Sequence, residues 1–372
     1  MPKLRFDQIA INSTEKKKPT ESDKDTYIGL EHLDSGVLEV TRWGSEVAPV
    51  GDKLVMRKGD VLFGRRRAYQ KKVAIAPFDG IFSAHGMVLR PRIEVITPEF
   101  FPFFISSDYF LDAAIQISVG SLSPTINWRD LCKLEFNIPT IDEQRQVVGI
   151  LWGMNRLRTA YTALLQQTDE LVKSQFIEMF GEGYPNAEYL PLKDCCIDIA
   201  GGKTPSMSHP EYYGGPIPFV KSGDVKSEAV SSGALWLSEI ALEKAGIKLV
   251  PKDAVIVVIR SAALRHEFNI AITQNPLVIN QDLKALQPKP EFLPLYLLWA
   301  IKSREDTLLS KVQTVLTSHI EMSDLAALPV MVANFEQQRF FCDFCVQADK
   351  SKFCCSVAEK MLIVASKATF SA

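Results

Sequence analysis

The stretch TIDEQR, residues 140–145, opens a long segment with apolar residues at helical spacing. The stretch NFEQQR, residues 334–339, opens a second such segment 194 positions later. In each stretch a residue that can cap a helix stands three positions before Glu or Gln, which is the pattern of a capping box. The sequence therefore predicts two long helices and an internal repeat with this period.

Three further pairs of blocks recur in the same order in both halves of the chain. Residues 58–63 correspond to 251–256, residues 101–105 to 293–297, and residues 126–131 to 320–325. Both members of the first pair read as a turn followed by a short buried strand. Short apolar blocks recur in any globular chain, but four blocks in one order at nearly one offset indicate a tandem duplication.

Length and composition are those of a soluble globular protein of two ordinary domains. The chain has 372 residues, of which 47% are hydrophobic and 23% charged, and this length lets each domain bury its own core. The N-terminal residues 1–7 lack the apolar region of a signal peptide. The longest apolar runs, such as residues 254–259, are far shorter than a membrane span. The sequence therefore predicts a cytoplasmic protein.

The predicted fold class is α+β, with two tandem globular domains at residues 1–139 and 183–333. In the first domain we expect strands at residues 53–56, 60–63, 72–75 and 87–90, separated by Gly, Pro and Asp, and a helix at residues 98–117. The spacer helices are expected at residues 140–182 and 334–372.

Both predicted spacer helices carry an apolar stripe. In the first helix it comprises Val147, Ile150, Met154, Leu157, Tyr161, Leu164 and Leu171. The second helix continues the pattern with smaller residues from Phe341 to Ala365. Two matched stripes favour an antiparallel coiled coil that separates the globular domains. The alternative is that each helix packs on its own domain.

Seven cysteines without a secretory context argue against a disulfide framework. Cys342 and Cys345 form a C-x-x-C pair, followed by Cys354 and Cys355, so a zinc site is one interpretation. On a single helix, however, Cys345 and Cys354 would lie about 13 Å apart along the axis, too far to share a metal. We therefore expect structural cysteines and no metal.

No catalytic motif stands out. The tripeptide at residues 202–204, GKT, resembles the end of a phosphate-binding loop, but the leading glycine is replaced by Ile197. Residues 275–277, NPL, do not complete the catalytic element of a DNA methyltransferase, and the zinc-protease and serine-hydrolase motifs do not occur. These absences favour a binding protein over an enzyme.

A net charge of −2 argues against a nucleic-acid partner for the chain as a whole. The local distribution is different, because residues 65–72, RRRAYQKK, place five cations and one aromatic residue in eight positions. This segment follows a predicted strand and is either a DNA-binding turn or a solvated basic turn.

Two sets of segments are distinctive: residues 201–206, GGKTPS, with 212–225, YYGGPIPFVKSGDV, in the second half, and residues 27–33, 59–69 and 120–126 in the first. Through them the chain resembles the specificity subunits of type I restriction-modification systems. The first set looks like the opening of a target-recognition domain of that family, and the second set looks like its other common variant. The resemblance covers essentially the whole chain, in the order domain, helix, domain, helix. The second half departs from the first at residues 314–320, TVLTSHI, where 120–126 would be matched.

The resemblance implies a non-catalytic subunit that reads double-stranded DNA, with each globular domain recognising one half of a split target. The helices would set the gap and dock two modification subunits, and restriction subunits would join through these. S-adenosylmethionine would bind to the modification subunits, and no cofactor to this chain. The alternative is a self-contained DNA methyltransferase or nuclease.

Candidate DNA-binding residues follow from this reading, since cations and hydroxyls near turns suit phosphates and an Arg can fork onto a guanine edge. For the candidates in the second domain the alternative is that they are ordinary surface residues. Tyr69 either stacks on DNA or packs within the protein. The candidates are Arg65, Arg66, Arg67, Tyr69, Lys71, Lys72, Lys203, Thr204, Lys221, Ser222, Arg260 and Arg265.

Overall fold

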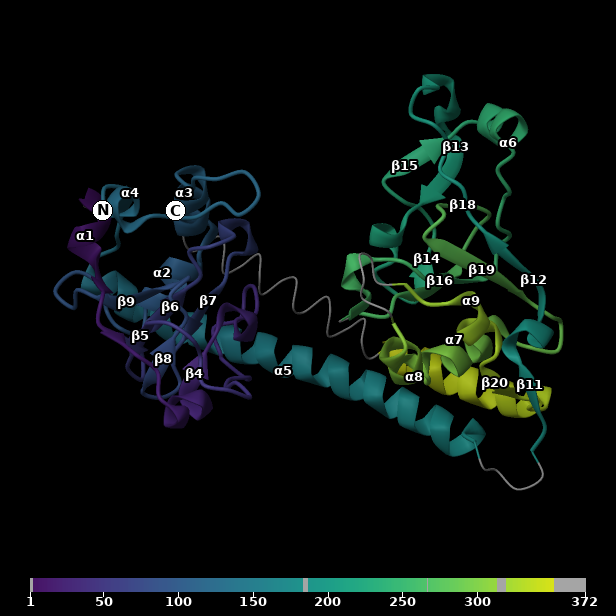
Figure 1. The fold of residues 1–372 in the computed structure, drawn as a ribbon, viewed down its shortest axis with the longest axis horizontal. Helices are drawn as coiled ribbons and strands as arrows, with labels where there is room; N and C mark the ends of the chain where they lie inside the picture. The colour runs from purple at the N-terminus through teal and green to yellow at the C-terminus, as the bar shows by residue number, and fades with distance from the viewer. Residues whose placement is uncertain (1–2, 183–186, 266, 313–318, 351–372) are drawn as a thin grey trace. The chain divides into compact units, whose positions relative to one another are not determined.

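The computed structural model describes residues 3–182, 187–265, 267–312 and 319–350. Contacts divide the chain into two compact units, with the boundary between Thr162 and Ala163. Each unit combines small β-sheets with short helices, and the long helix α5 (Ile141–Phe180) contributes residues to both (Figure 1). The predicted α+β class, the two tandem domains and the first long helix are confirmed.

The first unit contains three sheets. A two-stranded sheet pairs β1 with β10, a four-stranded sheet has the order β2-β9-β6-β7, and another has the order β3-β5-β8-β4. The strands are β1 (Lys3–Arg5), β2 (Ala10–Ser13), β3 (Lys16–Lys17), β4 (Tyr27–Ile28), β5 (Lys53–Met56), β6 (Val61–Phe63), β7 (Val73–Ile75), β8 (Gly80–Phe82), β9 (Met87–Pro91) and β10 (Glu135–Asn137). The short helices are α1 (Phe6–Ile9), α2 (Phe101–Ser106), α3 (Asp108–Gln116) and α4 (Trp128–Leu131). All four predicted strands are therefore present within a residue of their expected limits.

The second unit repeats this plan with variations. Its sheets have the orders β11-β20, β12-β19-β16-β17-β14 and β15-β13-β18. The strands are β11 (Tyr189–Pro191), β12 (Cys196–Gly201), β13 (Tyr213–Val220), β14 (Ala229–Val230), β15 (Leu235–Leu237), β16 (Val255–Val258), β17 (Ile270–Thr273), β18 (Val278–Ile279), β19 (Leu283–Pro288) and β20 (Pro329–Met331). The helices are α6 (Glu239–Ala245), α7 (Pro294–Lys302), α8 (Glu305–Ser310) and α9 (Met322–Ala326), and a further helix occupies 335–350.

The duplication predicted from sequence is visible in strand order. The order β2-β9-β6-β7 of the first unit matches β12-β19-β16-β17 of the second, and the pair β1-β10 matches β11-β20. The recurring blocks lie on equivalent elements: β6 corresponds to β16, α2 to α7 and α4 to α9. The two halves of the chain thus fold into related modules.

The single helix expected at residues 98–117 is wrong in one respect, because the structure has two helices there. Ser107 separates α2 from α3 with an extended backbone, φ −70° and ψ 147°. Its hydroxyl accepts a hydrogen bond from the amide of Phe110 and so caps α3. Apolar spacing alone does not reveal this break, since serine both interrupts one helix and begins the next.

Both predicted helix caps are present. The hydroxyl of Thr140 accepts from the amide of Glu143, while the Glu143 carboxylate accepts from the Thr140 amide at 2.7 Å. In the second module, Asn334 and Gln337 exchange the equivalent side-chain and backbone bonds at 2.9 and 3.1 Å. These bonds satisfy amides that a helix start leaves without partners, and so fix where each helix begins.

Helix α5 and the helix at 335–350 meet inside the second unit. The ring of Phe341 lies 5.1 Å from that of Phe176 and 5.8 Å from that of Phe180, centroid to centroid. Both α5 rings also pack on Tyr296 of α7. The two helices therefore contact each other and the module together. The predicted pairing beyond residue 350 lies outside the described residues.

Part of the α5 stripe faces solvent. Val147 packs against the core of the first unit, whereas four side chains seven positions apart are 45 to 63% exposed: Ile150, Leu157, Leu164 and Leu171. Their spacing gives one apolar line along the helix.

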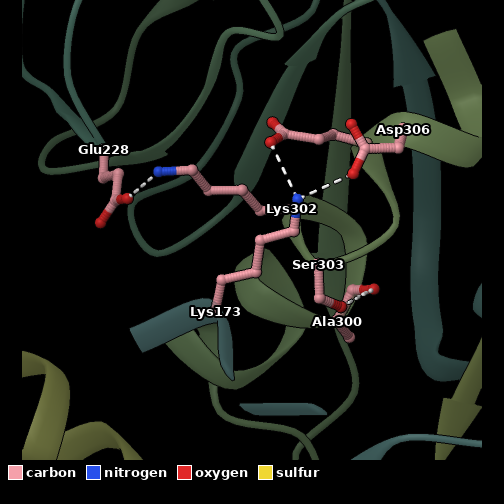
Figure 2. A network of polar contacts seen from close by, with 7 residues as sticks. Lys173, Glu228, Ala300, Lys302, Ser303 and Asp306 are labelled. Atoms are coloured by element: carbon pink, nitrogen blue, oxygen red, sulfur yellow. Dashed lines mark hydrogen bonds and ion pairs between the residues drawn. The ribbon is translucent and has the colours of Figure 1, made fainter. Parts of the chain in front are cut away.

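A polar network joins the second half of α5 to the helices of the second unit (Figure 2). The Nζ atom of Lys173 lies 3.3 Å from Glu305 and 3.0 Å from Asp306, both on α8. Nearby, Lys302 on α7 forms an ion pair with Glu228 and lies over the ring of Trp299. Lys173 and Lys302 are both largely buried. The bonds of Lys173 help to fix the packing of α5 on its second module, and those of Lys302 hold α7 to the segment before β14.

Four of the five described cysteines, Cys195, Cys196, Cys342 and Cys345, pack in the core of the second unit. Cys345 is buried, and burial raises the pKa of the Cys342 thiol to about 11, which keeps that thiol protonated and unreactive. Within the described residues no group of His, Cys, Asp and Glu side chains has the geometry of a metal site. Cys354 and Cys355 lie outside them. Among the described helices, none combines the length and apolarity needed to cross a membrane.

Candidate nucleic-acid interface

In the first unit, three loops meet beyond the ends of β6 and β8. The chain leaves β6 through Arg65 and Arg66, and the amide of Arg66 donates to the carbonyl of His85 in the loop after β8. From the third loop, the amide of Ile126 donates to the carbonyl of Arg65 at 2.9 Å, and Ser123 accepts from the Arg66 Nε atom at 3.1 Å. The fold thus brings His85 and Ser123, from two distant loops, to the arginines that follow β6.

The three consecutive arginines differ in exposure. Arg66 and Arg67 are exposed, whereas Arg65 is half-buried and donates to the carbonyl of Ala84. Arg67 has a left-handed backbone, φ 55°, and so has Lys71, φ 49°, on either side of the short 3-10 turn η3 (Ala68–Gln70). Two non-glycine residues in this conformation hold a strained, well-defined turn, which is common at functional sites.

Tyr69 lies on η3 with 56% of its surface exposed. Of the two interpretations of this ring, stacking on a partner and packing in the core, the exposure favours the first.

The two lysines of the basic segment point back to the protein. The Nζ atom of Lys71 lies 2.8 Å from Asp108 and 2.6 Å from Asp112; burial lowers its pKa, but the hydrogen bonds to these carboxylates raise it overall. Lys72 donates to the carbonyl of Leu30 at 2.6 Å, and burial lowers its pKa. Both lysines already have intramolecular partners, so either side chain would have to rearrange before it could contact DNA. A DNA contact by either lysine stays a prediction.

His85 is a member of this cluster that sequence reasoning missed. One imidazole nitrogen, Nε2, lies 3.4 Å from Nη1 of Arg66. Burial and the charges of Arg66 and Arg65 lower the pKa of His85, so the ring is neutral at pH 7. No sequence signal joins residues this far apart in the chain; only the strand pairing brings them together.

In the second unit, five of the six candidate residues gather around the loop after β18. The amide of Lys203 donates to the carbonyl of Ile279, and the hydroxyl of Thr204 donates to Gln281 Oε1 at 2.6 Å. Lys221 and Ser222 directly follow β13, which is parallel to β18, and the amide of Arg260 donates to the carbonyl of Asp282. The sixth candidate, Arg265, ends the 3-10 turn η7 (Ala262–Arg265). Its side chain is not among those that the structure describes, so its role stays a prediction.

The glycine before Lys203 is required by this arrangement. A Cβ atom at Gly202 would lie 2.1 Å from the carbonyl oxygen of Ile279 and 2.3 Å from that of Asn280. The GKT sequence therefore marks a close approach of two loops. The described residues 203–209 are not helical, whereas a helix directly follows the glycine-rich turn of a phosphate-binding loop.

The side chains of this cluster have different environments. Lys203 is exposed, but its Nζ atom donates to the carbonyl of Ala245 at the end of α6. Lys221 is exposed, with Nζ 5.8 Å from the ring of Phe219, and Arg260 is exposed. Asn280 is only 5% exposed and its Oδ1 atom has no hydrogen-bond partner. A buried unpaired oxygen beside exposed cations is typical of a site that a ligand or water completes.

Comparison with known proteins decides the family. Residues 9–167 and 186–350 match the sequence profile of the type I restriction modification DNA specificity domain, once in each module. The chain belongs to this family. Its duplicated architecture therefore consists of two copies of a specificity domain.

Curated relatives within the family are specificity subunits. The chain is 28% identical over 214 residues to the EcoR124I/EcoR124II specificity subunit of Escherichia coli, which covers 54% of this chain and 52% of that subunit. It is 30% identical over 110 residues to the MjaIX specificity subunit of Methanocaldococcus jannaschii, covering 29% of this chain and 24% of the relative. The first match thus spans about half the length of the relative.

Solved structures share the fold. The S subunit of the type I restriction-modification system of M. genitalium superimposes with a TM-score of 0.52 at 13% identity, covering 99% of this chain and 94% of that one. A chain from a structure of a type I R-M system superimposes with a TM-score of 0.51 at 21% identity, covering 100% and 96%.

Proposed function

We propose that this chain is the sequence-reading subunit of a type I restriction-modification complex, with each module recognising one half of a bipartite site in double-stranded DNA. The observation that carries the proposal is the pair of equivalent loop clusters, each with exposed cations at the same edge of its module. A binding face of this kind overcomes the chain's slight negative charge, because phosphate contacts depend on local charge density.

In this proposal the chain has no catalytic role and binds no cofactor. Two modification subunits bind S-adenosylmethionine and methylate adenine, and restriction subunits join through them in the cytoplasm. The apolar line on α5, from Ile150 to Leu171, suits helices of a partner protein, because exposed apolar side chains at seven-residue spacing gain free energy when covered. The domain limits proposed from sequence, 1–139 and 183–333, leave α5 as the spacer that sets the gap.

The experiment is a module exchange. The full chain and a hybrid, whose second module comes from another specificity subunit, are each expressed with the modification subunits, and methylated adenines are mapped in the host genome. We expect a split target for the full chain, and for the hybrid a target in which one half is retained and the other changed. An unsplit target, or methylation unchanged by the exchange, would contradict the proposal.

A second measurement separates the proposal from a self-contained enzyme. The purified chain alone is titrated with S-adenosylmethionine, with the assembled complex as the positive control. We expect binding by the complex alone. Saturable binding or methyl transfer by the isolated chain would favour a self-contained methyltransferase.

A further inference from the structure

Arg66 and Arg260 occupy the same position in the two modules. Arg66 forms an isolated antiparallel bridge with Thr125, and Arg260 forms one with His319. Both members of the first bridge stand 194 positions before those of the second, the same offset as the two helix starts. The two arginines are therefore equivalent residues of the duplicated fold, although the surrounding sequences differ.

The neighbouring hydrogen bonds confirm this equivalence. One residue along, the amide of Ile126 donates to the carbonyl of Arg65 at 2.9 Å, and that of Ile320 donates to the carbonyl of Ile259 at 2.8 Å. On the other side, the amide of Arg66 donates to His85 at 3.3 Å and the amide of Arg260 to Asp282 at 3.2 Å. Each arginine thus sits where the same three loops meet.

The fold itself does not require arginine at this position. The bridge and the flanking bonds use backbone N–H and C=O groups, which any residue except proline supplies. The adjacent positions differ between the modules: Arg65 corresponds to Ile259, which is 9% exposed, and His85 to Asp282. An exposed arginine at the same place in both modules therefore indicates a shared task for the guanidinium.

We propose that Arg66 and Arg260 are a matched pair of DNA anchors, each making the same contact in its own half-site. This inference rests on the proposed function. The contacted group is an acceptor that takes a guanidinium fork, on a phosphate or on the edge of a guanine. The dissimilar neighbours, His85 beside one anchor and Asp282 beside the other, give the two modules different surroundings for reading different bases.

The test uses the assembled complex of this chain with its modification subunits and a duplex carrying the mapped target. Affinity is measured across a salt series for the wild type, Arg66→Ala, Arg260→Ala and the double variant. Arg129→Ala, whose side chain is 87% exposed on α4, and Lys252→Ala, exposed in the turn before β16, are matched controls. Thermal unfolding of every variant verifies folding.

We expect each single variant to bind roughly 10- to 100-fold more weakly, by similar factors, and the double variant to show about their product. If the contacts are to phosphates, each variant lowers the salt slope by about one, and Arg→Lys retains most of the affinity. If they are to guanines, each variant relaxes specificity at one base pair of its own half-site and Lys does not restore the fork.

The outcomes separate the two proposals. A wild-type complex that does not distinguish its target from other DNA would refute the proposed function itself. A selective wild-type complex whose Arg66 and Arg260 variants bind like the controls would refute only the anchor pair. A large loss for one arginine and none for the other would also refute the anchor pair, because the two residues would not make the same contact.

Discussion

Gln144 and Gln338 join the start of each long helix to its module. Gln144 is fully buried; its Oε1 accepts from the amide of Thr97 at 2.8 Å, and its Nε2 donates to the carbonyls of Val95 at 3.0 Å and Pro139 at 2.8 Å. Gln338 is also fully buried and makes the same three bonds, with Leu293 and the carbonyls of Glu291 and Ala333. The duplication has thus kept a complete hydrogen-bonding unit.

We expect Gln144→Met to destabilise the first module by about 3–5 kcal/mol. Methionine keeps the length of the side chain but leaves one buried amide and two buried carbonyls without this partner, and an unsatisfied buried group costs about 1–3 kcal/mol. The cost of an unsatisfied carbonyl lies toward the lower end of this range, because a carbonyl has a second lone pair. For a unit of this size, the loss corresponds to a fall of roughly 10 °C in Tm.

The assay is thermal and chemical unfolding of the full chain, combined with hydrogen exchange. Gln146→Met is the matched control, since Gln146 is exposed two positions further along the same helix and should change stability by less than about 0.5 kcal/mol. Exchange at the Thr97 amide should accelerate in Gln144→Met, and exchange at Leu293 should accelerate only in Gln338→Met. If Gln144→Met is as stable as Gln146→Met, with Thr97 still protected, the buried bonds do not hold the helix to the module.

Three further perturbations test individual parts of the fold. Hydrogen bonds from Lys17 and from Thr20 lower the pKa of Asp23 to about 2. The ionised carboxylate therefore stabilises the fold above its ordinary pKa near 4, and this stabilisation is lost as pH falls toward 2. In calorimetry, Asp23→Asn should lower Tm at pH 7 and leave it nearly unchanged at pH 2. Tyr296→Phe removes a buried hydroxyl that donates to the carbonyl of Met331 at 2.7 Å and should cost about 1–2 kcal/mol in equilibrium unfolding. Gly202→Ala forces a methyl carbon against a carbonyl of β18, so it should lower Tm and weaken DNA binding by the assembled complex; unchanged values would show that the loops can separate.

Features that depend on local order along the chain can be read directly from the residues. The duplication, the two helix starts at Thr140 and Asn334, and the strands after turn residues follow from spacing, capping chemistry and alternation, all of which act between near neighbours. The basic segment at 65–72 is also recognisable from the sequence, because five of its eight residues are cations. What the sequence misplaced was the single helix at 98–117, because Ser107 is read equally well as a surface residue and as a cap.

Which polar residues lie together becomes known only from the folded chain. His85 joins Arg66, Thr204 joins Gln281, and Lys71 turns toward Asp108, in each case through strand pairing or loop contact between distant segments. The equivalence of Arg66 and Arg260 rests on the two bridges and on the flanking backbone bonds, in which any residue except proline could take part. Local sequence patterns determine the secondary-structure elements. A binding site depends instead on contacts between distant segments, and no sequence pattern shows which of these segments will meet.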